Sequence, residues 1–561
     1  MLRISFIFLI GITALSVSGA TGSSDGHSGN KLIKVLIFSG KNNHEWQKTT
    51  PLLIRMFNDS KFFTTQITEK PDTLSYISLN KYNLIVSNWN SYPDNNLRMS
   101  RKWENDFLRY VNEGGGALFF HAGSSSFYGW DDYHKIGIGR WGKQTSHGAP
   151  TIGKLKGFDQ RHPITKGISN FYIMDEIWEN TDIYPGAKVI GSLSADKGKN
   201  GHPVVVPAIF VNQTGKGRSF FTTLGHDERA LRNSGLQTLL LRAAQWCVGR
   251  KVTIEPVSEL RIAKTTLPNH YSWNKTDTSL TLRNHSEIVW QFNYNNRFGK
   301  PYFHPLTVNS INLTCVSPPD HPWHLGLWFS WKCINGVNYW EYLNNFNSPE
   351  TGYKSEGITE VVNKVIVTNP DFSSDIRMQL SYHPVNGKTV LTEERKLHLS
   401  PPGKDGSYYI DEENTFKAVT DSVMLDRTHI IGESGGQSWG GYSGLSVRYS
   451  QDFTSPTMIT PADTSNYGKG NWLYMGFNSL TGLKAGISVF QQPQFTTGST
   501  EWYVINDQKT PFYYYSPAIL FDHKIILKKE ETLNLKYRIW MLPGEADKKV
   551  LQGKFDEYRN K

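Results

Sequence analysis

The stretch Ala117–Ser126 constrains the fold most, because four apolar residues lead directly into His121, Gly123 and three serines. Gly114–Gly116 precede it, so the apolar run has the length of a strand and is bounded by turn residues. A strand without polar alternation is typical of a parallel sheet that is covered on both faces. Ligands of such sheets bind beyond the carboxyl ends of the strands, so we expect His121 to project into a crevice.

The first half of the chain, from residue 31 to residue 250, alternates strand-like and helix-like segments. The strand-like runs are short and apolar, and the segments between them carry apolar residues at helical spacing. This alternation predicts an α/β domain with a doubly wound sheet. We expect strands at Leu32–Phe38, Phe63–Thr68, Leu84–Ser87, Val204–Val211 and Ser219–Thr223, and helices at Pro51–Phe57, from Ser100 to Gly114 and from Ser234 to Gly249.

A second domain begins after this pattern ends. Residues 251–265 show little periodicity and are predicted to be a connector. Residues 266–545 contain strand-length runs separated by glycine, proline and asparagine, which favours an all-β sandwich. Asn335 and Gly336 lie between two apolar runs and predict a tight hairpin turn. A chain of 561 residues is long enough for two such domains.

The first 20 residues have the order of a secretory signal peptide. Met1–Arg3 is a short basic start, Ile4–Val17 is an apolar run, and Ser18–Ala20 offers small residues for cleavage. We therefore expect an exported protein, periplasmic or secreted. No later run approaches the roughly 20 apolar residues of a membrane span, so we do not expect the mature chain to cross a membrane.

Composition limits the partners that the protein can have. The net charge is +10, yet the sequence has no long cluster of lysine and arginine, so we expect no nucleic-acid partner. An acidic glycan suits an exported basic protein better. Aromatic residues make up 13% of the chain, and sugar rings stack on such side chains. Of the three cysteines, Cys247 is expected to be a buried thiol, whereas Cys315 and Cys333 could pair.

Three histidines each follow a predicted strand of the first domain. Because the carboxyl ends of parallel strands meet at one edge of a sheet, we expect the three imidazoles to lie close together. Histidine can serve as acid or base at neutral pH, and imidazole with carboxylate can also hold a divalent metal; the sequence leaves both alternatives open. The predicted catalytic residues are His44, His121, His226 and their expected neighbours His147, Glu176 and Asp227.

Three tryptophans lie in polar segments near these histidines. Trp46 is in the loop that contains His44, while Trp130 and Trp141 are in the polar segment 127–150, which we expect to form a lid or wall over the crevice. We predict that all three contribute to substrate binding, because a sugar ring can stack on an indole.

Taken together, residues 31–250 resemble the ThuA-like family, which is named for trehalose utilisation. The resemblance implies a fold related to class I glutamine amidotransferases. It also implies a role in bacterial breakdown of disaccharides and other glycosides, in some systems through 3-keto sugars. A 3-ketone acidifies the neighbouring C2 proton, so a positioned base and an electrophile would suffice to expel the C1 substituent. The motifs that carry the resemblance are Ser39–His44, Phe120–Gly123, Gly129–Tyr133, His162–Gly167, Asp175–Glu176 and Thr223–Asp227.

The departure from the amidotransferase pattern excludes amide transfer through a cysteine thiolate. Those enzymes place a nucleophilic cysteine where this chain has His121, and no cysteine lies between residues 21 and 246. Ser124–Ser126 lack the Gly-x-Ser-x-Gly frame of a serine nucleophile. A nicotinamide or flavin redox enzyme is not expected, because the Gly-x-Gly-x-x-Gly run at Gly137–Gly142 does not follow a predicted strand and open a helix, as a dinucleotide motif would. His162 is interpreted as the anchor of a turn, and Asp175–Glu176 could be strand-edge structure rather than ligands.

The second domain carries a motif with two histidines, Asp320–Phe329. With Lys300–Pro305, Asn335–Trp340, Gly440–Gly444 and Gly486–Phe490 it resembles the PmoA-like family across residues 266–545. We discount the oxygenase that this label implies, because the segment has no membrane span. A galactose-mutarotase-like sandwich, which binds sugar on a concave sheet, is a fold-level analogy. His321, Trp323 and His324 are the predicted substrate-binding residues; the two histidines could equally be acid and base, metal ligands or structural residues.

These observations favour an exported carbohydrate-active protein of glycan or disaccharide degradation. We expect it to cleave a glycoside, either acidic or 3-keto modified, by histidine-based acid/base or metal-assisted chemistry. The expected partner is an oligosaccharide or polysaccharide, and a divalent metal is the cofactor to consider. The alternative is a non-catalytic glycan-binding or scaffolding protein, which an open aromatic platform without a closed histidine cluster would favour.

Overall fold

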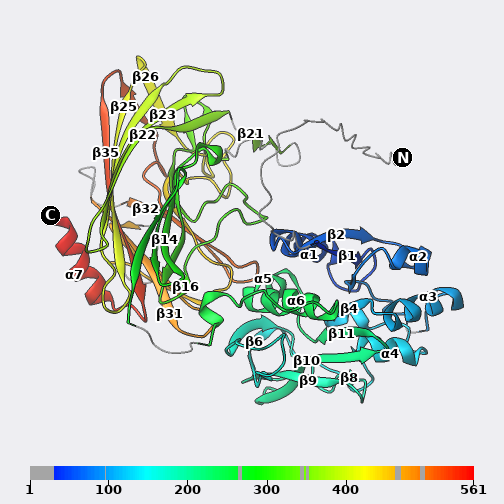
Figure 1. The fold of residues 1–561 in the computed structure, drawn as a ribbon. Coiled ribbons are helices and arrows are strands. Elements are labelled where there is room, and N and C mark those ends of the chain that lie inside the picture. Colours follow the sequence, from blue (N-terminus) through cyan, green and yellow to red (C-terminus); the bar gives the residue numbers. More distant parts are fainter. Residues whose placement is uncertain are drawn as a thin grey trace, which may run out of the picture.

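Two domains lie side by side in the structure, a computed structural model (Figure 1). The expected signal peptide, residues 1–20, lies outside the residues that it describes. Among the described residues, no helix combines the length and apolar character that a membrane crossing requires. The structure describes residues 31–94, 96–262, 268–341, 347–348, 353–354, 356–461, 469–492 and 500–560.

The first domain is built on a nine-stranded mixed sheet with strand order β2-β1-β3-β4-β11-β10-β9-β6-β7. The five strands from β2 to β11 are parallel, and from β11 to β7 each neighbour is antiparallel. The expected α/β class is confirmed, but the parallel doubly wound pattern covers only half of the sheet. The strands are β1 (Ile33–Phe38), β2 (Phe63–Thr68), β3 (Leu84–Ser87), β4 (Gly116–Phe120), β6 (Thr151–Lys156), β7 (Phe171–Asp175), β9 (Lys188–Ala195), β10 (Val204–Thr214) and β11 (Gly217–Thr222).

Helices cover both faces of this sheet. Strand β4 has no polar face, because Leu118 and Phe120 join one hydrophobic cluster while Ala117 and Phe119 join another. Helices α1 and α6 contribute to the first cluster, and α3 and α4 contribute to the second. The helices are α1 (Trp46–Asp59), α2 (Tyr76–Leu79), α3 (Arg101–Asn112), α4 (Asp131–Gly137), α5 (Glu228–Arg232) and α6 (Ser234–Cys247), with short 3₁₀ turns at Pro71–Thr73, His121–Ser124 and Ser258–Leu260.

The start of α1 differs from the prediction. The helix begins at Trp46, five residues before the proline that we expected at its first position. The extra turn is held from outside, since the amide of Asn88 donates to the hydroxyls of Thr49 and Thr50, both at 2.9 Å. By contrast, α3 begins where the sequence indicates, because the Ser100 hydroxyl accepts the Trp103 N–H at 3.2 Å.

The segment 127–150 is not a structureless lid. It contains α4 and the two-residue strand β5 (Gly139–Arg140), which pairs with β8 (Asp182–Ile183). The buried Phe127, Trp130 and Tyr133 fix it to the domain core. Two parts of it line a cleft, Tyr128–Gly129 and Arg140–Gln144.

The second domain is the expected β-sandwich. Ten strands form one sheet and eight form the other, and every pairing within the two sheets is antiparallel. One large hydrophobic cluster fills the space between them. The first sheet contains β12 (Tyr271–Lys275), β13 (Ser279–Asn284), β14 (Glu287–Asn293), β15 (Tyr302–Val308), β16 (Ile311–Asn312), β17 (Leu327–Ser330), β27 (Gly444–Arg448), β29 (Lys469–Gly470), β32 (Thr500–Asp507) and β33 (Phe512–Pro517); the second contains β22 (Gly357–Thr368), β23 (Ser374–Pro384), β24 (Leu391–Leu399), β25 (Tyr408–Ala418), β28 (Thr454–Ile459), β30 (Trp472–Asn478), β31 (Lys484–Gln491) and β35 (Thr532–Pro543).

Smaller elements complete the second domain. Helix α7 (Lys548–Arg559) lies on the outer side of the eight-stranded sheet (Figure 1) and buries Leu551 and Phe555 against it. Strands β18 (Cys333–Ile334) and β19 (Val337–Asn338) form the predicted hairpin. Its two turn residues have positive φ, 52° at Asn335 and 78° at Gly336, as a two-residue turn requires. All three cysteines are free thiols, so Cys315 and Cys333 do not pair.

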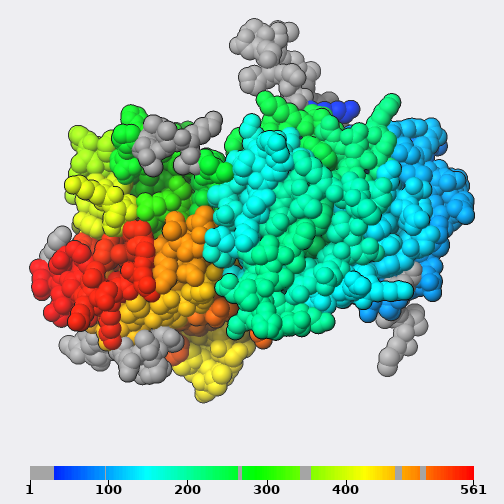
Figure 2. All heavy atoms as spheres, turned by 90° about the horizontal axis from the view of Figure 1, so that it is seen from below, coloured from blue at the N-terminus to red at the C-terminus, as the bar shows by residue number. Residues whose placement is uncertain are grey.

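Hydrogen bonds join the two domains, whose atoms meet along a continuous border (Figure 2). The N–H and hydroxyl of Ser234 both donate to the carboxylate of Asp452, at 2.6 and 2.7 Å. In the same way the N–H and hydroxyl of Thr481 donate to Glu259 of the connector, at 2.7 and 2.6 Å.

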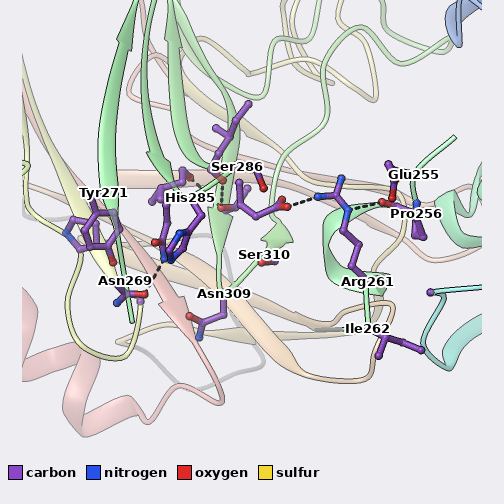
Figure 3. A pocket seen from close by; sticks show the side chains of 18 of the residues that line it. Glu255, Pro256, Arg261, Ile262, Asn269, Tyr271, His285, Ser286, Asn309 and Ser310 are labelled. Atoms are coloured by element: carbon purple, nitrogen blue, oxygen red, sulfur yellow. Dashed lines mark hydrogen bonds and ion pairs between the residues drawn. The ribbon is translucent and has the colours of Figure 1, made fainter. Parts of the chain in front are cut away.

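The connector borders a hollow of about 790 Å³ (Figure 3). Arg261 reaches across it to form an ion pair with Glu287 of β14 and also donates to the Pro256 carbonyl at 3.0 Å. The hollow is therefore crossed by contacts that hold the connector against the sandwich.

Candidate functional site

A sharp turn at the end of β4 places His121 at the edge of the parallel strands. His121 has φ +46°, in the left-handed region that non-glycine residues rarely adopt. The turn packs tightly on the end of β3, because a Cβ on Gly123 would lie 2.2 Å from the Ser87 carbonyl oxygen. The Ser87 hydroxyl also donates to the Gly123 carbonyl at 2.6 Å. The backbone thus holds the imidazole at a fixed position above the sheet.

The three histidines that follow β1, β4 and β11 converge as predicted. The Nε2 atoms of His44 and His121 are 3.2 Å apart. The His226 ring centroid lies 5.0 Å from that of His44 and 5.3 Å from that of His121. His121 is fully buried, and the other two rings are half-buried.

Glu176 completes this cluster from the loop after β7. Its Oε2 lies 3.5 Å from Nε2 of His121, and its Oε1 lies 3.3 Å from Nε2 of His226. One ligand atom from each of His44, His121, His226 and Glu176 lies within 4.8 Å of the others. We call these four residues the His3Glu centre. Trp178 supports it, because its indole N–H donates to Glu176 Oε2 at 3.4 Å and its ring lies 4.5 Å from that of His121.

Oxygen atoms behind the rings determine which nitrogens carry hydrogen. Nδ1 of His121 lies 2.9 Å from the Thr223 carbonyl, which can only accept, so this nitrogen is protonated. Nδ1 of His44 lies 3.0 Å from Oδ1 of Asn42, which also accepts an N–H of Asn90 at 2.7 Å. Both Nδ1 atoms therefore donate, and both Nε2 atoms present lone pairs to one another.

Burial and charge act differently on the three imidazoles. Burial, with the nearby His226 and His147, lowers the pKa of His44 to about 4. Burial also holds the pKa of His121 well below its ordinary value, so both rings are neutral at pH 7. Burial opposes protonation of His226 as well, but the carboxylates of Asp227 and Glu176 raise its pKa above 6.5.

Asp175, which we interpreted as structural, is a buried support for this edge. Its carboxylate accepts the N–H groups of Gly225 at 2.7 Å and His226 at 3.3 Å, and so fixes the backbone that carries the third imidazole. Burial raises the pKa of Asp175 to about 7, although these donors oppose the shift.

His147 and Asp227 lie next to the centre, as predicted. Nδ1 of His147 donates to the Gly148 carbonyl at 2.7 Å and lies 3.3 Å from Oε1 of Glu176. The side chain of His147 is 34% exposed, more than any other group whose contact with Glu176 is described here. Oδ2 of Asp227 lies 3.7 Å from Nδ1 of His226, an ion-pair distance, while its Oδ1 caps α5 by accepting the Ala230 N–H at 2.9 Å.

Among the three predicted substrate-binding tryptophans, only Trp141 is placed between the centre and a cleft. Its ring lies 5.5 Å from that of His147 and 5.2 Å from that of Trp178. It also lines a cleft of about 1120 Å³ together with Tyr128 and Arg140.

The other two tryptophans are placed differently. Trp130 is 7% exposed and stacks on Tyr133 in the core, so the prediction that it binds substrate is wrong. Burying the large apolar ring in the core is more favourable than exposing it, although its neighbours in sequence are polar. Trp46 is half-buried at the first position of α1.

The serines after His121 are structural. All three are buried, and each hydroxyl is used to hold the chain: Ser125 accepts the Trp141 N–H at 3.0 Å and Ser126 accepts the Ser91 N–H at 2.9 Å. Ser124 donates to the Gly139 carbonyl. None is available as a nucleophile. His162 is also structural, since its Nδ1 accepts the Ile164 N–H at 3.3 Å within a turn.

The predicted residues of the second domain also come together. His321, Trp323 and His324 line one pocket of about 290 Å³ at the edge of the ten-stranded sheet. Its other walls are aromatic side chains from distant parts of the domain, among them Trp340, Trp439 and Phe512, which the sequence motif did not indicate.

Sequence reasoning missed the residues behind the imidazoles. Asn42 and Asn90 follow β1 and β3 and lie at the same edge as His44, so their positions after strands were an available signal. The Thr223 carbonyl left no signal in the sequence, because any residue at that position supplies the same backbone oxygen.

Two family models match the chain. Residues 34–247, most of the first domain, match the model described as trehalose utilisation (ThuA). Residues 279–556 match a family of unknown function, DUF6807. The PmoA-like resemblance of the second domain is not shown by this match. No curated protein matches the chain.

Solved structures similar to this chain include two described as ThuA-like. A putative ThuA-like protein from Parabacteroides merdae is 25% identical, covering 42% of this chain and 96% of that one, with a TM-score of 0.37. One from Bacteroides uniformis is 20% identical, covering 42% and 99%, with a TM-score of 0.33. A glutamine amidotransferase from Thermotoga maritima is 11% identical, covering 38% and 91%, with a TM-score of 0.23.

Proposed function

We propose that this protein is an exported carbohydrate-active enzyme that cleaves a glycoside at a divalent metal bound by the His3Glu centre. One observation carries the proposal: the Nε2 lone pairs of His44 and His121 face each other at 3.2 Å, with Glu176 and His226 closing the same cluster. Two lone pairs at this distance repel unless a cation lies between them. Burial lowers the pKa of His44 to about 4, so at neutral pH a proton is not that cation.

The spacing of the donor atoms supports a metal. Four ligands at about 2.0–2.1 Å around a tetrahedral ion are about 3.3–3.4 Å apart. Nε2 of His121 lies 3.2 Å from Nε2 of His44 and 3.5 Å from Oε2 of Glu176, and Nε2 of His226 lies 3.3 Å from Oε1 of Glu176. One ligand atom from each of the four residues lies within 4.8 Å of the others, so a bound ion would draw the widest pairs closer. Oxygen acceptors behind metal-bound imidazoles are also the usual arrangement, since they fix the tautomer and orientation of the ligand. Imidazole and carboxylate suit Zn²⁺ and other first-row divalent ions.

Because the four residues would fill a tetrahedral shell, the metal would need to accept a fifth ligand to act as a Lewis acid on a sugar oxygen or to lower the pKa of bound water. The residues around it supply the remaining functions. His147 is partly exposed beside Glu176 and can move a proton to or from the leaving oxygen. Trp141 lies beside this imidazole, also lines the cleft, and offers an indole edge or face to a sugar ring. The same groups serve hydrolysis by water or, in a 3-keto sugar, removal of the C2 proton followed by loss of the C1 substituent.

Three features support carbohydrate as the substrate class. The first domain matches a family described as trehalose utilisation. The cleft beside Trp141 is long enough for more than one sugar unit, at about 1120 Å³. Arg98, Arg140 and Lys143 line it and favour an acidic glycan, although Arg98 and Arg140 are partly neutralised by Glu104 and Asp182.

Export is proposed from the signal-peptide pattern of residues 1–20, and mass spectrometry of the mature N-terminus in cell fractions tests it.

The activity is tested with panels of native and 3-oxidised glycosides, neutral and acidic, by measuring released aglycone or reducing ends. We expect the metal-loaded protein to cleave one class, EDTA to abolish cleavage, added metal to restore it, and His121→Ala to lose it. The matched control is His202→Ala, which removes an exposed imidazole of the same domain. Binding without turnover in the metal-loaded protein would favour the non-catalytic alternative, and cleavage that survives both EDTA and His121→Ala would refute the metal centre.

A further inference from the structure

The pocket of the second domain has the shape of a ligand site. It encloses about 290 Å³ beside β32 and β33, far along the chain from the His3Glu centre. This volume is at the small end of known ligand pockets, which span roughly 300–1,000 Å³, and fits one small ring rather than an extended chain. Most of its wall is aromatic and is formed by Trp323, Trp340, Trp439, Tyr442, Tyr503 and Phe512.

Two imidazoles supply the polar groups of this pocket. His324 is 4% exposed, and its Nδ1 has no hydrogen-bond partner in the described part of the chain. Burial holds the pKa of His324 well below its ordinary value, so the ring is neutral and has one N–H and one lone pair. An unpaired buried nitrogen is unfavourable, and a ligand hydroxyl would satisfy it once the ring turns toward the pocket.

The second imidazole is held in one orientation. Nδ1 of His321 donates to the carboxylate of Asp320 at 2.9 Å, and Arg448 donates to the same carboxylate oxygen at 2.8 Å. Although burial opposes it, His321 and Arg448 hold the pKa of Asp320 well below its usual range. The ring centroids of His321 and His324 are 4.7 Å apart, so two imidazoles are available to neighbouring hydroxyl groups.

Cations already lie against three of the aromatic rings. Lys300 lies 5.7 Å from the ring of Trp340, Lys332 lies 5.5 Å from that of Tyr442, and Arg448 lies 3.6 Å from that of Phe512. A cationic ligand, which aromatic cages otherwise favour, would be repelled by these charges. A neutral sugar ring is still stabilised when its polarised C–H bonds stack on the aromatic faces.

We propose that this pocket binds a single neutral pyranose ring, whose C–H face stacks on the tryptophans while its hydroxyls bond to His321 and His324. Aromatic walls, paired imidazoles and a small volume together match that ligand class. The site lies in the second domain and does not depend on the proposed metal chemistry of the first.

Saturation-transfer NMR with the methyl pyranosides of glucose, galactose, mannose and xylose tests the proposal on the full mature chain. We expect at least one to bind in the millimolar range or tighter. Trp439→Ala should weaken it roughly tenfold, whereas Trp439→Phe, which keeps an aromatic face, should retain most of the affinity. Trp439 is 41% exposed, so neither change should affect folding.

His321→Ala should also weaken binding, while the control His429→Ala, which removes a 47% exposed imidazole outside the pocket, should not. The same titrations on EDTA-treated protein and on His121→Ala separate this site from the metal centre, because binding should be unchanged in both. Failure of all four pyranosides to bind, binding that survives Trp439→Ala and His321→Ala, or stronger binding of tetramethylammonium would overturn the proposal.

Discussion

Each imidazole of the His3Glu centre depends on the group behind it. The carbonyl of Thr223 and the amide oxygen of Asn42 take the Nδ1 hydrogens, and this turns the Nε2 lone pairs of His121 and His44 toward a common point. Without those acceptors either ring could adopt the other tautomer or turn away. Groups of this kind usually account for about 10- to 100-fold in metal affinity.

Asn42→Ala tests this dependence at a residue that is not a ligand. We expect metal affinity to fall by about 10- to 100-fold with little change in fold, measured by competition with a chromophoric chelator. Asn43→Ala is a matched control, because Asn42 and Asn43 each accept an N–H of Asn90 at 2.7 Å but only Asn42 contacts the His44 ring. Equal affinities in the two variants would contradict the tautomer argument.

Proton release on metal binding reports the charge state of His226. A ligand imidazole must be neutral, and the carboxylates of Asp227 and Glu176 raise the pKa of His226 above 6.5. At pH 6 we expect about one proton to be released per metal bound, and the release to vanish as pH rises through that pKa. His44, with a pKa of about 4, adds none in this range. Calorimetry in buffers of different ionisation enthalpy measures the release.

Asp227→Asn should lower the pKa of His226 and reduce this release while keeping an oxygen to cap α5. A release that does not change between pH 6 and 8, or that is the same in the variant, would contradict the assignment.

The histidines were predictable, and of their two acceptors Asn42 left a signal in the sequence whereas the Thr223 carbonyl did not. His44, His121 and His226 each follow a strand, so the edge of the sheet brings them together whatever the details of packing. Trp130 shows the limit of such reasoning, because its neighbours in sequence are polar while its neighbours in space are Trp103, Phe107 and Tyr133.

At the scale of elements, the turn from β4 into His121 positions the centre. Gly123→Ala places a methyl group 2.2 Å from the Ser87 carbonyl, so the turn must move. We expect a loss of about 1–3 kcal/mol in the free energy of unfolding, measured with urea, and loss of metal binding. The control is Gly553→Ala in α7, where nothing lies within 4 Å and alanine should instead stabilise the helix by about 0.5–1 kcal/mol. Metal binding that persists unchanged in Gly123→Ala would argue against this role of the turn.

Strand and helix positions in the first domain followed largely from local pattern. β2 and β3 have the predicted limits, because their apolar runs end in polar turns. The direction of β6, β7, β9 and β10 could not be predicted, since a buried strand has the same composition in parallel and antiparallel pairing. The additional turn of α1 depends on Asn88, 38 residues beyond the nearer threonine that it contacts.

At the scale of the whole molecule, α5 links the two sites. It is capped by Asp227 beside His226 and ends at Arg232, whose guanidinium lies 3.8 Å from Asp320 in the second domain. Sequence alone predicts two domains but not this contact, because no local pattern encodes which surfaces meet.

Replacing Asp452 tests how much the hydrogen bonds between the domains contribute to stability. Its carboxylate accepts two hydrogen bonds from Ser234, and burial raises its pKa to about 6. Asp452→Ala leaves the Ser234 N–H without this partner, so we expect a loss of about 1.5–3 kcal/mol in the free energy of unfolding and a broader thermal transition in calorimetry. The exposed Asp421→Ala is the control. Identical stability of the two variants would mean that this contact contributes nothing to joining the domains.

X-ray absorption spectroscopy of the chain loaded with Zn²⁺ tests the metal centre most directly. We predict one ion per chain, with about three imidazole nitrogens and one carboxylate oxygen at about 2.0–2.2 Å, and loss of this ion in His121→Ala. Failure to bind a stoichiometric ion, or a coordination shell without imidazole, would contradict the account.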